Sequence, residues 1–114
     1  FENTGSFPKT YYVWVRGRAF DGLSGMGNAD SVHAGIDGTI PSTSSDLADS
    51  GWRGKWYWSK KTSTGTASIT VPSAGEHTFH LWMREDGFMA DKVLLTTSST
   101  FTPTGTGPAE SVKN

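Results

Sequence analysis

Cysteine is absent from this sequence of 114 residues, and neither sign of charge predominates in it. Without cysteine the chain forms no disulfide and carries no thiolate metal site and no cysteine nucleophile. Ten basic and eleven acidic residues give a formal net charge of −1, and they form no block that would attract nucleic acid or an anionic membrane. No run approaches the ~18 apolar residues that a membrane helix requires. We therefore expect neither a nucleic acid nor a membrane among the partners.

Apolar residues are also few. Hydrophobic residues make up 34% of the chain, whereas 29 residues are Ser or Thr, 14 are Gly and 5 are Pro. This composition is typical of short strands joined by many turns, and it argues against a helical bundle. The length suffices for one domain. The chain begins at Phe1, without Met or a signal peptide, which we interpret as a processed product or an excised fragment.

The strongest strand signal lies at residues 10–16, where β-branched and aromatic residues alternate. Tyr11, Val13 and Val15 share the face that we expect to enter the core. Weaker patterns predict further strands at residues 30–37, 55–59, 67–71, 76–84 and 88–96. No segment has a convincing apolar period of 3.6 residues. The sequence therefore predicts an all-β fold, an antiparallel β-sandwich of the jelly-roll type.

The connections between these strands carry their own signals. Asp37 and Gly38 are a favourable pair for a tight turn. Residues 39–54 form a long polar loop, and loops of this length are often functional. In the strand expected at residues 76–84, alternation places Met83 on the core face together with its apolar neighbours two and four positions earlier.

The usual catalytic patterns are weak. His77 and His80 are three residues apart, which puts them on opposite faces of a strand, so we do not expect them to share a metal. The serine within residues 21–25 lacks the strand-to-helix turn of a nucleophile elbow. Asp86 and Asp91 could supply the two carboxylates of glycoside hydrolysis, but a turn-and-strand pair on so small a domain is better explained as structural. We therefore expect no enzymatic activity.

Tryptophan is the residue type that calls for an explanation, because five are present in a chain with so little aliphatic core. Trp52, Trp56 and Trp58 crowd the end of the long polar loop. Aromatic rings of this kind stack on the apolar C–H faces of sugars, and Arg53 and Lys55 beside them can bond hydroxyl groups. The alternative is that these rings fill the core of a small sandwich.

Five segments together resemble a known family of modules. They are residues 11–17, 30–38, 56–58, 71–78 and 84–96. In order and spacing they are similar to carbohydrate-binding modules of family 6 and related families, in the galactose-binding-like jelly-roll superfamily. Such modules occur on bacterial glycoside hydrolases and polysaccharide lyases. The resemblance implies a secreted bacterial module, extracellular or at the cell surface, that binds a polysaccharide or oligosaccharide for a linked catalytic domain. We expect this module at residues 1–96, followed by a tail or linker rich in Thr, Gly and Pro at residues 97–114.

The chain departs from the family at its start. Modules of this family begin with a strand whose paired glutamates help to bind a structural calcium, whereas residues 1–9 offer only Glu2. The first strands are thus missing or divergent. Asp91 matches the acidic position of the final strand, so the resemblance leaves a calcium ion at Asp91 as an expectation to be tested.

The resemblance also bears on the sugar site. Trp52 or Trp56 corresponds to the family's central tryptophan, but Met89 stands where the family has a binding asparagine. Arg84 or Asp86 would have to supply that contact. The candidate carbohydrate-binding residues are thus Trp52, Arg53, Trp56, Trp58, Arg84 and Asp86.

The sequence does not name the sugar, and a rival function stays open. Neutral, sulfated and uronic-acid glycans are all compatible with it, although Arg16, Arg18, Arg53 and Arg84 would suit an anionic one. The rival is a structural or adhesive β-sandwich of a bacterial surface or extracellular assembly that binds no sugar. It predicts buried tryptophan rings and an apolar interface.

Overall fold

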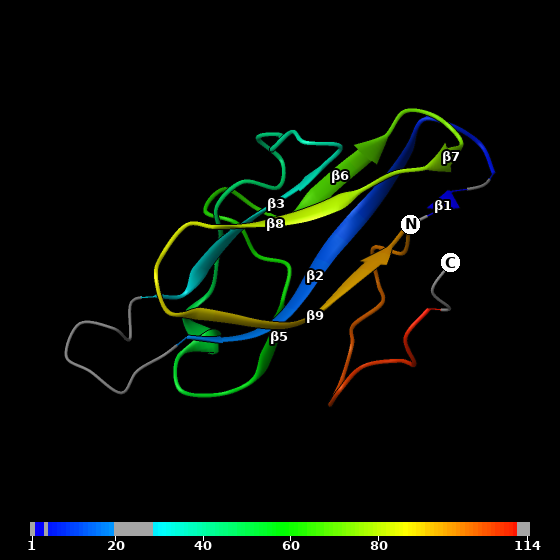
Figure 1. Cartoon of the computed structure of the whole chain (residues 1–114). Coiled ribbons are helices and arrows are strands. Elements are labelled where there is room, and N and C mark those ends of the chain that lie inside the picture. The colour runs from blue at the N-terminus through cyan, green and yellow to red at the C-terminus, as the bar shows by residue number, and fades with distance from the viewer. Residues whose placement is uncertain (1, 4, 20–28, 112–114) are drawn as a thin grey trace.

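A computed structural model describes residues 2–3, 5–19 and 29–111 of the chain. Within these residues the chain forms short strands and one 3-10 helix (Figure 1). In chain order the elements are β1 (Glu2–Asn3), β2 (Lys9–Ala19), β3 (Ser31–Ile36), β4 (Leu47–Ala48), η2 (Ser50–Trp52), β5 (Tyr57–Ser59), β6 (Ser68–Val71), β7 (Gly75–Glu76), β8 (Phe79–Met83) and β9 (Phe88–Thr96). No helix in this part of the chain has the length and apolar character needed to cross a membrane.

Strand β2 is the centre of the larger sheet. Strand β9 pairs with it along one edge, while β6 and β5 pair with the first and second halves of its other edge. A second sheet has the order β4-β3-β8. Strands β1 and β7 pair with each other in a separate two-stranded sheet. Every pair of strands is antiparallel. Figure 1 shows β3 and β8 lying over β2 and β9, so the expectation of an antiparallel β-sandwich is confirmed.

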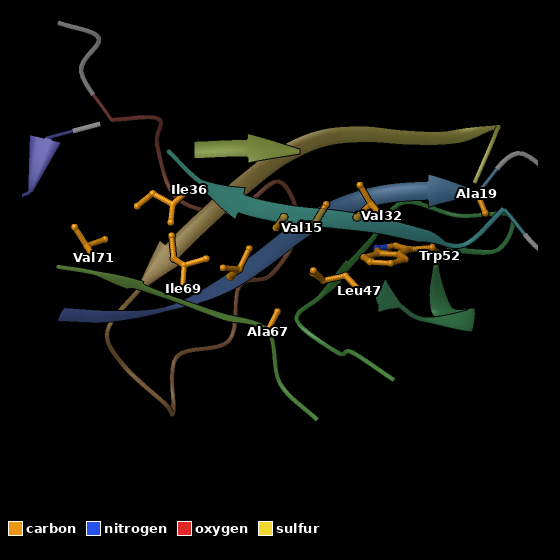
Figure 2. Packing of buried hydrophobic residues seen from close by; sticks show 11 residues of the cluster. Val15, Ala19, Val32, Ile36, Leu47, Trp52, Ala67, Ile69 and Val71 are labelled. Carbon is orange, nitrogen blue, oxygen red and sulfur yellow. The ribbon is translucent and has the colours of Figure 1, made fainter. Parts of the chain in front are cut away.

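The core lies between the two sheets. Its buried members are Val13, Val15, Ala19, Val32, Ala34, Ile36, Leu47, Trp52, Ala67, Ile69 and Val71. Figure 2 shows Trp52 beside Leu47 toward the end that holds Ala19, while Ile69 and Val71 lie at the opposite end. The face of β2 that the sequence predicts to enter the core does so. Val13 and Val15 are fully buried, and Tyr11 packs against this core.

The predicted tight turn is also present. Asp37 and Gly38 have φ angles of 50° and 82°, and positive φ at both central residues is the mark of a type I′ hairpin turn. Ile36 and Thr39 exchange backbone hydrogen bonds of 3.0 Å across it.

The long polar loop is more ordered than the sequence suggested. It contains β4 and η2, and Asp49 caps η2 by accepting a hydrogen bond of 2.8 Å from the backbone N–H of Gly51. Ser44 is buried in this loop, and its hydroxyl donates to the carbonyl of Ala34 on β3 at 2.6 Å. Polar side chains thus satisfy backbone groups that would otherwise be buried without partners.

Met83 does not lie in the core as expected. It is 76% exposed at the end of β8, although its Cα partner Val32 is buried. Alternation predicts correctly the face of β8 on which Met83 lies. It does not predict whether other residues cover that face, and at the end of β8 the described residues leave Met83 exposed to solvent.

Candidate functional site

Arg16 lies on the outward face of the larger sheet. Its Cα partners are Trp58 on β5 and Lys92 on β9. Residues directly opposite each other project to the same face of a sheet, and the adjacent Val15 points into the core. Arg16, Trp58 and Lys92 therefore form a row across the outward face.

Trp56, just before β5, keeps its ring open to solvent. It is 43% exposed. The guanidinium carbon of Arg16 lies 5.3 Å from its ring centroid, which is within the range of a cation–π contact. Nη1 of Arg16 also donates to Oδ2 of Asp91 at 2.5 Å. An exposed indole fixed beside a polar pair can stack on a sugar face while the polar atoms bond its hydroxyl groups.

Trp58 is partly covered by the C-terminal tail. Its Nε1 donates to the carbonyl oxygen of Gly105 at 3.0 Å, and Nε of Arg16 donates to the same oxygen at 3.2 Å. Nζ of Lys92 donates to the carbonyl of Thr106 at 3.0 Å. A Cβ on Gly107 would lie 2.7 Å from Cζ2 of Trp58, so the glycine backbone rests directly on the indole. Residues 105–107, which we call the tail strap, thus pack against the row formed by Arg16, Trp58 and Lys92.

A hollow of about 310 Å³ adjoins this row. Its lining includes the side chains of Trp14, Tyr57, Trp58 and Lys60. Nζ of Lys60 lies 5.0 Å from the ring centroid of Trp14 and 4.9 Å from that of Tyr12. The hollow thus combines aromatic rings with the ammonium group of a lysine, and this combination suits a small polyhydroxylated ligand.

Trp52 belongs to the core rather than to this surface. It is fully buried, its Nε1 donates to the carbonyl of Tyr57 at 2.8 Å, and its ring meets Phe88 edge-on at 4.8 Å. The ring has no free face for a sugar. The expectation that Trp52 stacks on a ligand is therefore corrected to a structural role.

The other predicted polar residues lie apart from Trp56. Nε of Arg53 pairs with Asp30 at 2.8 Å. Arg84 pairs with Asp46 at 2.9 Å and with Glu85 at 2.7 Å. These carboxylates neutralise both arginines beside the second sheet.

Asp86 is exposed in the turn between β8 and β9. Within the described residues, no hydrogen bond or ion pair joins Arg53, Arg84 or Asp86 to Trp56 or Trp58. Of the six candidates, the structure brings only Trp56 and Trp58 together on the outward face.

Asp91, the residue at which calcium is expected, has an arginine as its partner. Its carboxylate is engaged by the guanidinium of Arg16. A calcium ion takes six to eight oxygen ligands, but no three acidic or histidine side chains gather to hold a metal within residues 5–19 and 29–111. Asp91 holds Arg16 over Trp56, and calcium at Asp91 stays a prediction.

A histidine–aspartate pair joins the β3 turn to the segment before β8. Nδ1 of His77 lies 2.6 Å from Oδ2 of Asp37, and the backbone N–H of Thr78 donates to Oδ1 at 2.9 Å. The hydrogen bond that Nδ1 of His77 donates to Asp37 raises the pKa of His77 above its ordinary value. The N–H of Thr78, followed by His77, lowers the pKa of Asp37. The pair therefore clasps two loops together.

The sequence marked Arg16 as a residue that would suit an anionic glycan, but it did not place Arg16 or Trp14 in the candidate site. Trp14 and Arg16 alternate with the core valines, and Arg16 directly faces Trp58. The alternation identified their face, but nothing in the sequence paired β2 with β5. Knowledge of this register would have placed Arg16 in the candidate site.

Comparison with known proteins identifies a family whose members this chain resembles in sequence. The glycosyl hydrolase family 115 C-terminal domain matches residues 3–110. The chain is also 35% identical, over 109 residues, to a protein of Formosa agariphila called Uncharacterized protein P23, with 89% of this chain and 25% of that protein covered. It thus spans about a quarter of the length of that relative. No solved structure matches the chain.

Proposed function

The chain belongs to the family of glycosyl hydrolase family 115 C-terminal domains, and we propose from this premise that it is a non-catalytic carbohydrate-binding module. In this proposal the domain is secreted with a linked hydrolase and holds that hydrolase on its polysaccharide. The family supports the association with a glycoside hydrolase, and the outward face of the larger sheet supports the binding of sugar.

The observation that carries the proposal is the exposed ring of Trp56 under the guanidinium of Arg16. A pyranose ring stacked on this indole would cover apolar surface that water now covers. Its hydroxyl groups would reach Arg16, Asp91 and the adjoining hollow. Stacking on an aromatic ring contributes ~1–3 kcal/mol, judged from nucleic-acid bases, so a site with one or two rings binds in the micromolar to millimolar range.

The pairing of the arginines bears on the kind of sugar. Arg16, Arg53 and Arg84 are each neutralised by a carboxylate. The argument for an anionic glycan that rested on these arginines is thereby weakened. We propose that binding depends on stacking and hydroxyl contacts, so that added salt changes the affinity little.

The proposal is tested by retention of the protein on a panel of neutral, uronic-acid and sulfated polysaccharides in native affinity gels. Trp56→Ala is compared with the matched change Trp82→Ala, because Trp82 is a partly exposed tryptophan of the second sheet that stacks on His80. We expect Trp56→Ala to abolish retention and Trp82→Ala to preserve it. The proposed site is wrong if Trp56→Ala is still retained. It is also wrong if no glycan retains the unaltered chain.

A further inference from the structure

Two strands at the margins of the sandwich have a free edge. Strand β9 pairs with β2 only, and β8 pairs with β3 only, as far as the described residues extend. The free edge of β9 runs along a strand of nine residues. Such an edge presents unpaired N–H and C=O groups and is a template for another strand.

Side chains beside these edges face inward but are not covered. Val93 is opposite Val15, which is fully buried, yet Val93 is 36% exposed. Met83 is opposite the buried Val32 and is 76% exposed. In a closed sandwich the inner faces of both sheets are covered by each other. Here the inner faces are left partly exposed at Val93 and Met83.

A groove of about 1140 Å³ follows the same edge. Its apolar lining includes side chains of β2, β8, β9 and the tail, among them Tyr11, Phe79, Val93, Leu95 and Phe101. At one side the lining also reaches Trp58, Asp91 and Lys92 of the outward face. Polar groups from Glu76, His77 and Glu110 lie along its margin. Six consecutive residues of β9, from Asp91 to Thr96, contribute to the lining. A lining that follows a strand suits an extended peptide better than a compact small molecule.

We propose that an extended segment from the preceding part of the same polypeptide occupies this groove and adds as a strand to the free edge of β9. Its alternate apolar side chains cover Val93 and Leu95, and its backbone bonds the free N–H and C=O groups of β9. The inference goes beyond sugar binding, because it concerns the backbone edge of β9 and the inward-facing Val93 and Leu95 rather than the exposed ring of Trp56.

The family relationship gives the reason for this occupant. The matching family is described as a C-terminal domain of a hydrolase, and three quarters of the Formosa agariphila relative lies outside the matched region. A strand from the same polypeptide has a high effective concentration at the groove, so a modest intrinsic affinity suffices to keep it docked. A second copy of this chain, pairing β9 with β9, is the competing occupant.

Hydrogen–deuterium exchange distinguishes these possibilities. The amide groups of β9 that point away from β2 are compared in the isolated 114-residue chain and in the full-length polypeptide that carries it. We expect these amides to exchange at least 100-fold more slowly in the full-length polypeptide. Equal rates in the two proteins overturn the proposal. Slow exchange in the isolated chain, together with a dimer in sedimentation velocity, also overturns it in favour of the second copy.

Two substitutions on β9 locate the contact. Val93→Lys places a charge in the groove, whereas Met89→Lys is a matched control, because Met89 is 40% exposed and lies opposite Arg18 on the other side of the strand. In the full-length polypeptide, Val93→Lys should abolish most of the protection of β9 and Met89→Lys should leave it intact. Equal effects of the two variants contradict docking in the groove.

Phe101→Lys serves as a second variant, since Phe101 lines the groove and its 39% exposure leaves less packing for lysine to disrupt in the isolated chain. If Val93→Lys fails to fold, Phe101→Lys should still loosen the docked segment, and unchanged protection of β9 in that variant counts against the proposal. Neither change should alter retention on glycan, because Trp56 lies on the outward face. Loss of docking and loss of sugar binding are therefore separate results.

Discussion

The guanidinium of Arg16 lies over the indole of Trp56, with 5.3 Å between the guanidinium carbon and the ring centroid. Arg16 lies on β2, and Trp56 lies just before β5. They meet because β5 pairs with β2 in a register that puts Arg16 opposite Trp58. Asp91 holds the guanidinium from the other neighbouring strand. This three-residue arrangement supports the candidate sugar site.

Arg16→Ala should weaken glycan binding without abolishing it. The change removes a partner for the hydroxyl groups of the sugar, and a net ~0.5–1.5 kcal/mol for one hydrogen bond corresponds to about two- to twelve-fold in affinity. Isothermal titration with the best-retained oligosaccharide measures the effect. Arg53→Ala is the control, because Arg53 pairs with Asp30 and makes no described contact with the ring of Trp56. An equal loss in both variants would argue for a general effect on the fold.

Gly107→Ala should lift the tail strap from Trp58. Gly107 has a φ of 80°, and an added Cβ would lie 2.7 Å from the indole. A residue other than glycine at such a φ costs roughly 1–3 kcal/mol, so the strap should detach and the tryptophan emission should shift to the red. Gly105→Ala has positive φ but no atom within 4 Å of the new Cβ, and separates backbone strain from the clash. An identical emission spectrum in Gly107→Ala would show that the strap does not rest on Trp58.

Trp52→Ala should destabilise the fold severely. The side chain is fully buried and bonds the carbonyl of Tyr57, and removal of a large aromatic side chain from a core costs about 3–5 kcal/mol. Urea denaturation followed by circular dichroism measures the loss. Trp82→Ala, at a partly exposed position, should cost distinctly less. A mild effect at Trp52 would conflict with its assignment to the core.

The His77–Asp37 clasp should make stability depend on pH. The raised pKa of His77 means that its contribution is complete below the ordinary histidine value of 6.5 and is lost as pH rises through the raised value. The lowered pKa of Asp37 means that its contribution is complete above the ordinary value of 3.8 and is lost as pH falls through the lowered value. Thermal unfolding of the unaltered chain and of His77→Gln should therefore differ most between these two ordinary values. A difference that grows above neutral pH would contradict the clasp.

Much of the fold could be predicted from the sequence, since alternation marked the strands and the Asp37-Gly38 pair marked a type I′ turn. The position of Trp52 could not be predicted in this way. Its burial depends on η2, a single 3-10 turn capped by Asp49, that directs the ring inward. A polar loop carries no periodic signal for such a turn.

The exposure of Met83 and the partners of the arginines had a different cause. Alternation identifies which face a side chain takes, but it does not tell whether another strand covers that face. Likewise, Arg84 was available as a sugar contact until the fold brought Asp46 to it. Both features depend on contacts between segments far apart in the sequence.

The indole N–H signals of the five tryptophans in a nuclear magnetic resonance titration test the central claim most directly. Each tryptophan gives its own signal, assigned by single substitutions. On addition of a retained oligosaccharide, the signals of Trp56 and its neighbour Trp58 should shift and saturate together, while those of Trp52 and Trp82 stay unchanged. Saturating shifts at Trp82 with none at Trp56 would contradict a sugar site on the outward face of the larger sheet.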